Sequence, residues 1–159
     1  MKILAVDPGY ERLGIAILDN SNNKNGDLIF SECFRTSAED EHSQRLSEIQ
    51  ERIEELIKEY SPKELAIEDL FFSVNTTSAM KVAETRGIII SSSKKSGLNI
   101  FEYNPQEIKV AVGGDGHCDK KAVIKMIPLL IKIDNRKRLD DEYDAIACGL
   151  THFAINGQK

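Results

Sequence analysis

The sequence predicts an α/β fold with a mixed five-stranded sheet flanked by helices. Two patterns of apolar residues predict it. Short continuous apolar runs, such as Ile3–Val6, are typical of buried strands, whereas apolar residues spaced by three and four between residues 39 and 60 are typical of an amphipathic helix. The two patterns alternate along 159 residues, which indicates a single domain, residues 1–159, large enough to bury a core.

The first strands are expected at residues 2–6, 14–18 and 28–36. A turn around Pro8–Tyr10 separates the first two, and the polar stretch Asn20–Gly26 separates the second from the third. Short connections of this kind join antiparallel neighbours, so the sequence predicts a three-stranded meander.

A helix is expected next, over residues 39–60, and then a strand over residues 65–68. Thr36 with Glu39, or Ser37 with Asp40, offers a capping signature at the helix start, and Pro62 ends it. A buried strand reached through a helix implies a parallel crossover, which makes the first and fourth strands neighbours.

The remaining elements are predicted as a helix from about residues 76–78 to 90, a strand over 99–103 and three further helices. These helices are expected at residues 105–112, 119–132 and 141–155, with a glycine loop at 113–116. Gly87 interrupts the first helix of this series at a cost of about 1 kcal/mol relative to alanine, so close packing against another backbone is expected there. This order of elements is that of ribonuclease H-like folds.

Four carboxylates stand where short apolar segments end or begin. Asp7 and Glu68 each follow a predicted buried strand, and Asp144 directly precedes the apolar run Ala145–Cys148, with Asp141 three residues earlier on the same helix face. Carboxylates beside a core are costly unless they are paired or bind a cation. Oxygen ligands from separate elements suit Mg²⁺ or Mn²⁺, and two such ions about 4 Å apart suit phosphodiester cleavage.

Each carboxylate also has a structural alternative. Strand ends and helix starts favour acidic residues in any case, and the acids at residues 140–142 complement the dipole of the last helix. Asp140 and Asp69 lie next to Asp141 and Glu68 and are close competitors for those two assignments.

The charge is unevenly distributed along the chain. The net charge is −5, which argues against a nucleic-acid partner, but residues 73–138 contain 12 Lys/Arg and only 6 Asp/Glu. A basic block beside a carboxylate cluster is what a nuclease needs to hold phosphates. The block includes Lys81, Arg86, Lys94, Lys95, Lys109, Lys120, Lys121, Lys125 and Arg136–Arg138.

Several other classes of protein are disfavoured. Apolar runs approach neither the length of a membrane span nor that of a signal peptide, so a cytoplasmic protein without a membrane partner is expected. Cys33, Cys118 and Cys148 are widely spaced and indicate neither a disulfide framework nor a zinc site.

The chain resembles the RuvC family of Holliday-junction resolvases over nearly its whole length. The ending Asp-x-x-Asp-Ala-x-Ala, in register with the other segments, is the most specific part of the resemblance. The matching segments are Ile3–Gly9 with Gly14, Ala66–Glu68 with Phe71, Ala83–Gly87, Glu102–Tyr103, Lys109 with Val112–Gly113, and Asp141–Ala147.

The resemblance implies a homodimeric, Mg²⁺-dependent endonuclease that nicks two opposing strands of a four-way DNA junction in recombination and repair. Asp7, Glu68, Asp141 and Asp144 match the family's catalytic, metal-binding positions. They would hold two ions, Mg²⁺ or alternatively Mn²⁺, one activating water and the other stabilising the leaving 3′ oxygen. A branch-migration helicase complex is an implied further partner.

The resemblance also implies contacts with DNA. Lys109 and Lys120 match lysines near the active site, with Lys121 as the alternative to Lys120, and Phe71 or Phe72 matches an aromatic that stacks on an unpaired base. Arg86 and Gly87 fall on a helix like the family's dimer interface, and Lys81 lies on the same helix. A pI of about 5.3, with Asp69 and Asp115 as extra acids, departs from the family pattern and predicts weaker junction affinity or steeper dependence on metal and salt.

Three other functions are weighed against this one. A ribonuclease H-like nuclease acting on RNA is disfavoured by the Asp-x-x-Asp ending and the basic block. A sugar-kinase or actin-like ATPase shares the turn from Asp7 to Gly14, but such ATPases need two related lobes and a longer chain. A junction-binding scaffold without catalysis is disfavoured by the complete set of four acids.

Overall fold

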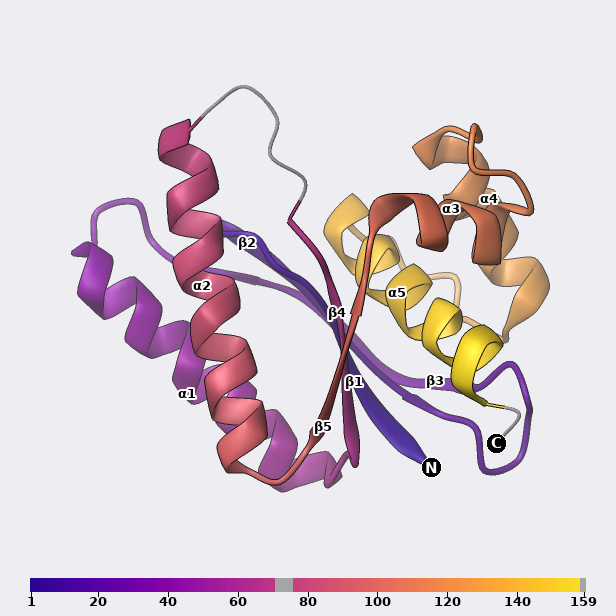
Figure 1. Ribbon diagram of the computed structural model, residues 1–159, viewed down its shortest axis with the longest axis horizontal. Coiled ribbons are helices and arrows are strands. Elements are labelled where there is room, and N and C mark those ends of the chain that lie inside the picture. The colour runs from indigo at the N-terminus through magenta and orange to yellow at the C-terminus, as the bar shows by residue number, and fades with distance from the viewer. Residues whose placement is uncertain (71–75, 158–159) are drawn as a thin grey trace.

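A five-stranded sheet forms the middle layer of the molecule, with helices on both faces (Figure 1). The computed structural model describes residues 1–70 and 76–157. The strands lie in the order β3-β2-β1-β4-β5. Their bounds are β1 (Lys2–Asp7), β2 (Arg12–Asp19), β3 (Asp27–Arg35), β4 (Glu64–Glu68) and β5 (Asn99–Tyr103).

The strand pairing confirms the predicted mixed sheet. β1, β2 and β3 form the antiparallel meander, and β4 pairs in parallel with β1 on one side and with β5 on the other. Because β1 and β4 are parallel neighbours, Asp7 and Glu68 end at the same edge of the sheet.

The helices divide between the two faces of the sheet. α1 (His42–Tyr60) and α2 (Thr76–Lys95) cover one face, while α3 (Pro105–Gly113), α4 (Lys120–Leu130) and α5 (Asp140–Asn156) lie on the other (Figure 1). The interior of β1, Ile3–Val6, is apolar because both faces of the strand are covered. Ile3 and Ala5 join the core under α5, and Leu4 and Val6 join the core under α1.

The predicted start of α1 is wrong. The helix begins at His42, and its N-cap residue Glu41 makes no side-chain capping bond. Thr36 is used elsewhere, since its hydroxyl donates to the carbonyl of Tyr10, and the Ser37 hydroxyl accepts from the Glu39 N–H in a local turn. The other helices match their predictions more closely, although α2 continues to Lys95.

Gly87 does not have the packing contact that was expected of it within the chain. A Cβ built on Gly87 would meet no heavy atom of the described residues within 4 Å.

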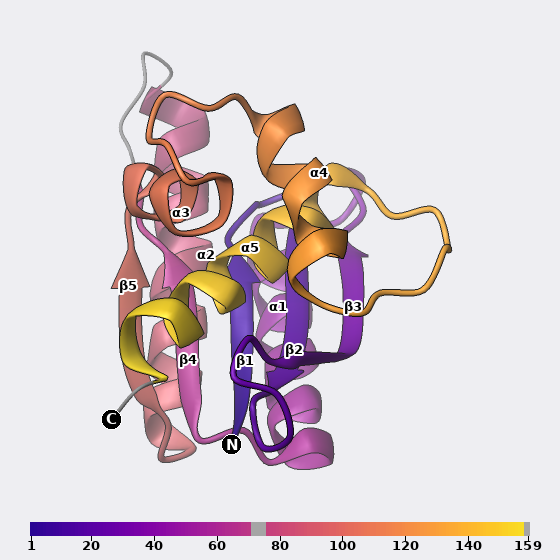
Figure 2. The ribbon, with the colours of Figure 1, turned by 90° about the vertical axis from the view of Figure 1, so that its right-hand side faces the viewer.

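Helix α5 crosses the sheet over β1 and β2 at very short range (Figure 2). A Cβ at Gly14 on β2 would lie 2.0 Å from the carbonyl oxygen of Asp141, and one at Gly149 would lie 2.5 Å from a methyl carbon of Leu18. The backbone of α5 therefore leaves no room for a side chain at Gly14, and the side chain of Leu18 leaves none at Gly149. This approach brings the start of α5 onto the end of β1, since Gly14 pairs with Asp7.

Gly14→Ala is expected to destabilise the protein by about 1–3 kcal/mol, because the new methyl group would force the first turn of α5 away from the sheet. The atom it meets is a backbone oxygen, which cannot move alone. The urea midpoint of purified protein measures the loss. A midpoint equal to that of the wild type would contradict the close packing of α5 on β2.

Candidate active site

The four predicted carboxylates come from three separate elements at one edge of the sheet. Asp7 ends β1, Glu68 ends β4, and Asp141 and Asp144 lie in the first two turns of α5. The register places Val6 beside Ile67, so the next residue of each strand is one of these acids. The close seating of α5 on Gly14 then adds the two aspartates.

Three of these acids line one hollow with a volume of about 280 Å³. Two lysines and several apolar side chains complete its wall, so the carboxylates face a small, partly dry space. The lining residues are Asp7, Glu68, Pro105, Ile108, Lys109, Lys120, Val123, Asp144 and Ala147.

Burial and mutual repulsion make these acids hard to ionise. Burial raises the pKa of Asp7 well above its usual value, and the charges of Glu68, Asp144 and Asp141 raise it further. Burial, followed by the charge of Asp144, raises the pKa of Glu68 to about 7. Burial is also the main reason why the pKa of Asp144 is raised. A cation placed among these groups would relieve both costs.

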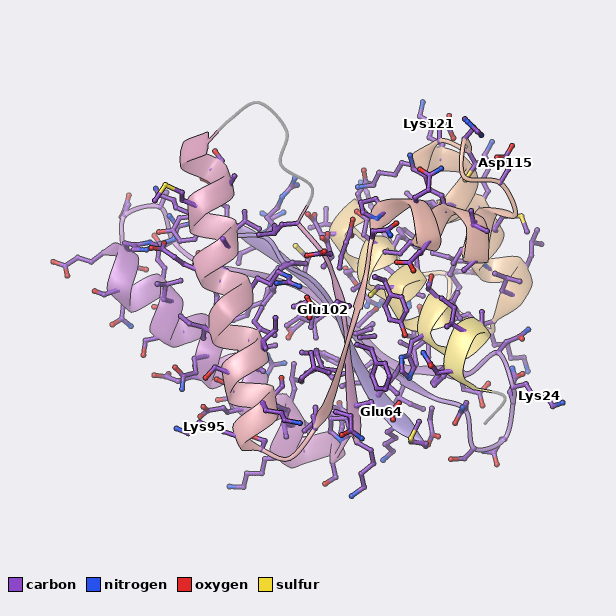
Figure 3. The ribbon with its side chains drawn as sticks, viewed as in Figure 1. Lys24, Glu64, Lys95, Glu102, Asp115 and Lys121 are labelled. Carbon is purple, nitrogen blue, oxygen red and sulfur yellow. The ribbon has the colours of Figure 1, made fainter. Side chains whose placement is uncertain are left out.

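Lys120 provides part of that positive charge within the chain. Its ammonium group donates to Asp144 Oδ2 at 2.5 Å, and the same lysine lowers the pKa of Asp7 and Glu68. Lys109 lies in the wall of the same hollow. Lys121 instead projects from the outer end of α4 (Figure 3), so the geometry favours Lys120 over its neighbour.

The donor set fits a hard divalent cation. Carboxylate oxygens from three elements meet at a site where the protein alone leaves excess negative charge. Across residues 1–70 and 76–157, however, no three acidic, histidine or cysteine side chains already lie close enough together to hold an ion. Lys120 lies among these carboxylates and bonds to Asp144.

Asp141 lies at the rim of the site and has partners of its own. Arg12 at the start of β2 approaches Asp141 Oδ2 at 3.6 Å, and the Cys33 thiol donates to the same oxygen at 3.9 Å. Sequence reasoning missed both contacts, because Arg12 and Cys33 meet Asp141 only through the pairing of β2 with β3. No local pattern marks either residue.

The two competing acids lie further out. The Asp140 side chain is 70% exposed and lies 3.9 Å from Lys120, whereas Asp141 is much more buried. The Asp69 side chain is 53% exposed and lies 3.2 Å from Arg86. Neither competitor lines the hollow that contains Asp7, Glu68 and Asp144, although Asp69 lines a smaller, adjoining hollow with Asp7 and Glu68.

The residues predicted to contact DNA have varied positions. Lys81 lies on α2 with its ammonium group 5.0 Å from the ring centre of Tyr10.

The Arg86 side chain is only 15% exposed, pairs with Asp69 and Glu102, and donates to the carbonyl of Glu68. Its charge is thus used within the chain. Phe71 and Phe72 lie outside the described residues.

Part of the basic block is structural, which corrects its interpretation as a row of phosphate contacts. The Arg138 side chain is 3% exposed and bonds to Asp134 and Ser31, while Arg136 donates to the Ser31 carbonyl and to buried Glu142 at 2.6 Å each. Glu142 lies between Asp141 and Asp144 on α5. These arginines therefore fix the first turn of α5 to β3.

Comparison with known proteins identifies the family. The family model for crossover junction endodeoxyribonuclease RuvC matches residues 3–152. The chain belongs to the RuvC family. A RuvC from Thermosipho melanesiensis is 40% identical over 92% of this chain and 93% of its own length, and one from Brachyspira hyodysenteriae is 39% identical over 98% and 96%.

Solved RuvC structures agree with the fold. A structure of Thermus thermophilus RuvC in complex with a Holliday junction substrate superimposes with a TM-score of 0.89 at 27% identity, covering 96% of this chain and 92% of that chain. The family members are hydrolytic, metal-dependent endonucleases of DNA recombination and repair, and this chain is one of them. In the described part of the chain, no helix is long and apolar enough to cross a membrane.

Without divalent cations, the protein is expected to lose stability as the pH rises from about 5 to about 8. Because the pKa of Glu68 is raised to about 7 and that of Asp7 is raised in the same direction, the folded state binds more protons than the unfolded state in this window. Stability therefore falls as these protons are lost, by on the order of 2 kcal/mol. Urea denaturation in a chelator at several pH values measures it.

Glu68→Gln is the matched control for this titration. Its amide cannot ionise, so the loss of stability with rising pH should be smaller than in the wild type, and Mg²⁺ should reduce the loss in the wild type. Identical pH dependence in the two proteins would contradict the perturbed state of Glu68.

Proposed function

We propose that this RuvC-family protein acts as a homodimer on four-way DNA junctions and nicks two opposing strands symmetrically. The observation that carries the proposal is that Asp7, Glu68 and Asp144 share one hollow with Lys109 and Lys120. An acidic site flanked by cations suits a phosphodiester that has to approach divalent metal ions.

Asp7, Glu68, Asp141 and Asp144 are the residues that would hold the cations, with Asp141 joining from the rim. Two Mg²⁺ ions, or Mn²⁺ in their place, would supply an activated water and stabilise the leaving 3′ oxygen. The chain's own contribution is to bring these carboxylates together, partly buried, at the end of the sheet. Burial and mutual repulsion raise the pKa values of Asp7 and Glu68, and bound positive charge would offset both effects.

Lys120 would exchange partners during the reaction. Its bond to Asp144 compensates the carboxylate charge before cations bind. Cations held by Asp144 would leave the Lys120 ammonium group free for the scissile phosphate, where it would offset the developing negative charge. Lys109 faces the same hollow and would bind the phosphate from α3.

The dimer would form through α2. Gly87 on this helix faces open space, and Met80, about two turns earlier, is 66% exposed. A glycine lets a second backbone approach closely, and a two-fold axis at α2 would relate two metal sites to two opposing junction strands. A branch-migration helicase complex as a further partner follows from the family alone.

The decisive assay is cleavage of a synthetic four-way junction in Mg²⁺. The wild-type protein should produce two nicked duplexes and leave linear duplex DNA and RNA hairpins largely uncut. Cleavage of the RNA hairpin in preference to the junction would support an RNA nuclease instead, and junction binding without cleavage in any metal would support a scaffold.

Asp7→Asn should lower junction cleavage by at least about 100-fold while junction binding is retained, because it removes a metal-binding charge and adds no bulk. Asp140→Asn is the matched control, since Asp140 is an exposed acid on the same site's border, and it should cut normally. Normal cutting by Asp7→Asn would show that Asp7 does not hold the metal. Loss of cutting by Asp140→Asn would show that Asp140, in place of Asp141, belongs to the metal site.

A further inference from the structure

We infer that Arg12 and Arg35 form a second phosphate-binding subsite, which holds a DNA backbone phosphate next to the scissile one, at the rim of the metal site where Arg12 contacts Asp141. The inference rests on the proposed function, because it assigns a position to the DNA strand that is cut. Neither arginine belongs to the basic block of residues 73–138.

The sheet register places the two arginines next to the carboxylates. Asp7 on β1 pairs with Gly14 on β2, which pairs with Cys33 on β3, so these residues form one row across the sheet. Arg12 pairs with Arg35. Arg12 lies two residues before Gly14 on β2, and Arg35 lies two residues after Cys33 on β3, so the side chains of this pair point to the same face of the sheet as those of the first row. Since side chains alternate along a strand, both arginines lie on the face that carries Asp7 and α5.

Contacts agree with this placement. Arg12 Nε lies 3.6 Å from Asp141 Oδ2. Burial and the charge of Asp141 raise the pKa of the Cys33 thiol, while neighbouring Arg35 and Arg12 act in the opposite direction. The Cys33 thiol therefore lies near Asp141 and within the electrostatic reach of both guanidinium groups.

The present environment of the pair leaves its positive charge largely uncompensated. Like charges directly opposite each other on antiparallel strands destabilise a sheet. Arg12 has one carboxylate partner at ion-pair distance, its side chain is 54% exposed, and a pair of that kind contributes little free energy. Arg35 is exposed as well. A phosphate between them would relieve the repulsion.

The chemistry of the ligand follows from the groups that face it. Two guanidinium groups present planar forks of N–H donors, which match the oxygens of a phosphodiester. The site would then have two cationic groups, the lysines that line the hollow with Asp7 and Glu68 and the arginines at the rim beside Asp141. A DNA strand that contacts both groups would pass across the carboxylate site.

Arg12 also has a simpler possible role, which is to position Asp141. The two roles differ in what they affect. A positioning residue alters the rate of cleavage and leaves the salt dependence of binding unchanged, whereas a phosphate contact contributes to that salt dependence because its formation releases counterions from DNA.

The test measures junction binding by Arg12→Gln and Arg35→Gln in an Asp7→Asn background, in Mg²⁺, at several salt concentrations. Each substitution should weaken binding about tenfold near 0.1 M salt and reduce the slope of log affinity against log salt concentration by about one. Lys24→Gln is the matched control, because Lys24 is an exposed cation in the β2–β3 turn at the opposite end of these strands (Figure 3), and it should change neither quantity.

The outcomes separate this inference from the proposed function. Thermal melting confirms that each variant is folded, and cleavage by the protein with Asp7 intact tests the proposed function independently. If that protein cuts junctions while Arg12→Gln and Arg35→Gln bind with the affinity and salt slope of Lys24→Gln, the subsite is overturned. Reduced cleavage by Arg12→Gln with unchanged affinity and slope also overturns it, in favour of positioning of Asp141.

Discussion

The whole site depends on how closely helix α5 packs against β1 and β2. The helix carries two of the four acids, and the sheet carries the other two at the ends of neighbouring parallel strands. Only glycine at positions 14 and 149 allows the helix to reach this depth. The buried bonds of Ser31 with Arg136, Arg138 and Glu142 then fix its first turn. Two distant parts of the sequence are thereby held together before any ligand binds.

This packing has an electrostatic cost that gives the site its chemistry. Carboxylates that are buried near one another raise each other's pKa, and here Lys120 compensates only part of the charge. A protein optimised for stability alone would not keep such a cluster. The cost is consistent with a site whose normal state includes bound cations.

Much of the fold follows from local patterns in the sequence. The apolar runs and the helical spacing predict the order of the ten elements, and parallel pairing of β1 with β4 follows from the crossover through α1. The same reasoning places Asp7 and Glu68 at one edge of the sheet. Each acid directly follows the last apolar residue of its strand, Val6 or Ile67, and so marks the strand's end. Asp141 and Asp144 share a helix face by their spacing.

Other features depend on contacts between residues that are distant in the sequence. The pairing of Arg12 with Arg35, the approach of Arg12 to Asp141 and the burial of Arg138 arise from the register of β2 and β3 and from the path of the α4–α5 connection. Composition places Arg136 and Arg138 in a basic block suited to phosphates, because arginines are mostly exposed unless a buried acid such as Glu142 pairs with them. The start of α1 was mispredicted for a related reason, since the Thr36 hydroxyl bonds to Tyr10 in preference to the helix.

The central claim is that Asp7, Glu68, Asp141 and Asp144 together hold divalent metal ions. The most direct measurement is a crystal structure of the wild-type protein in Mn²⁺ at about pH 7, with the ions located by their anomalous scattering. The account predicts anomalous peaks among the carboxylates of Asp7, Glu68 and Asp144, with Asp141 drawn toward them and Lys120 displaced from Asp144. A fully ordered site without such a peak at millimolar Mn²⁺, with Lys120 still bound to Asp144, would contradict it.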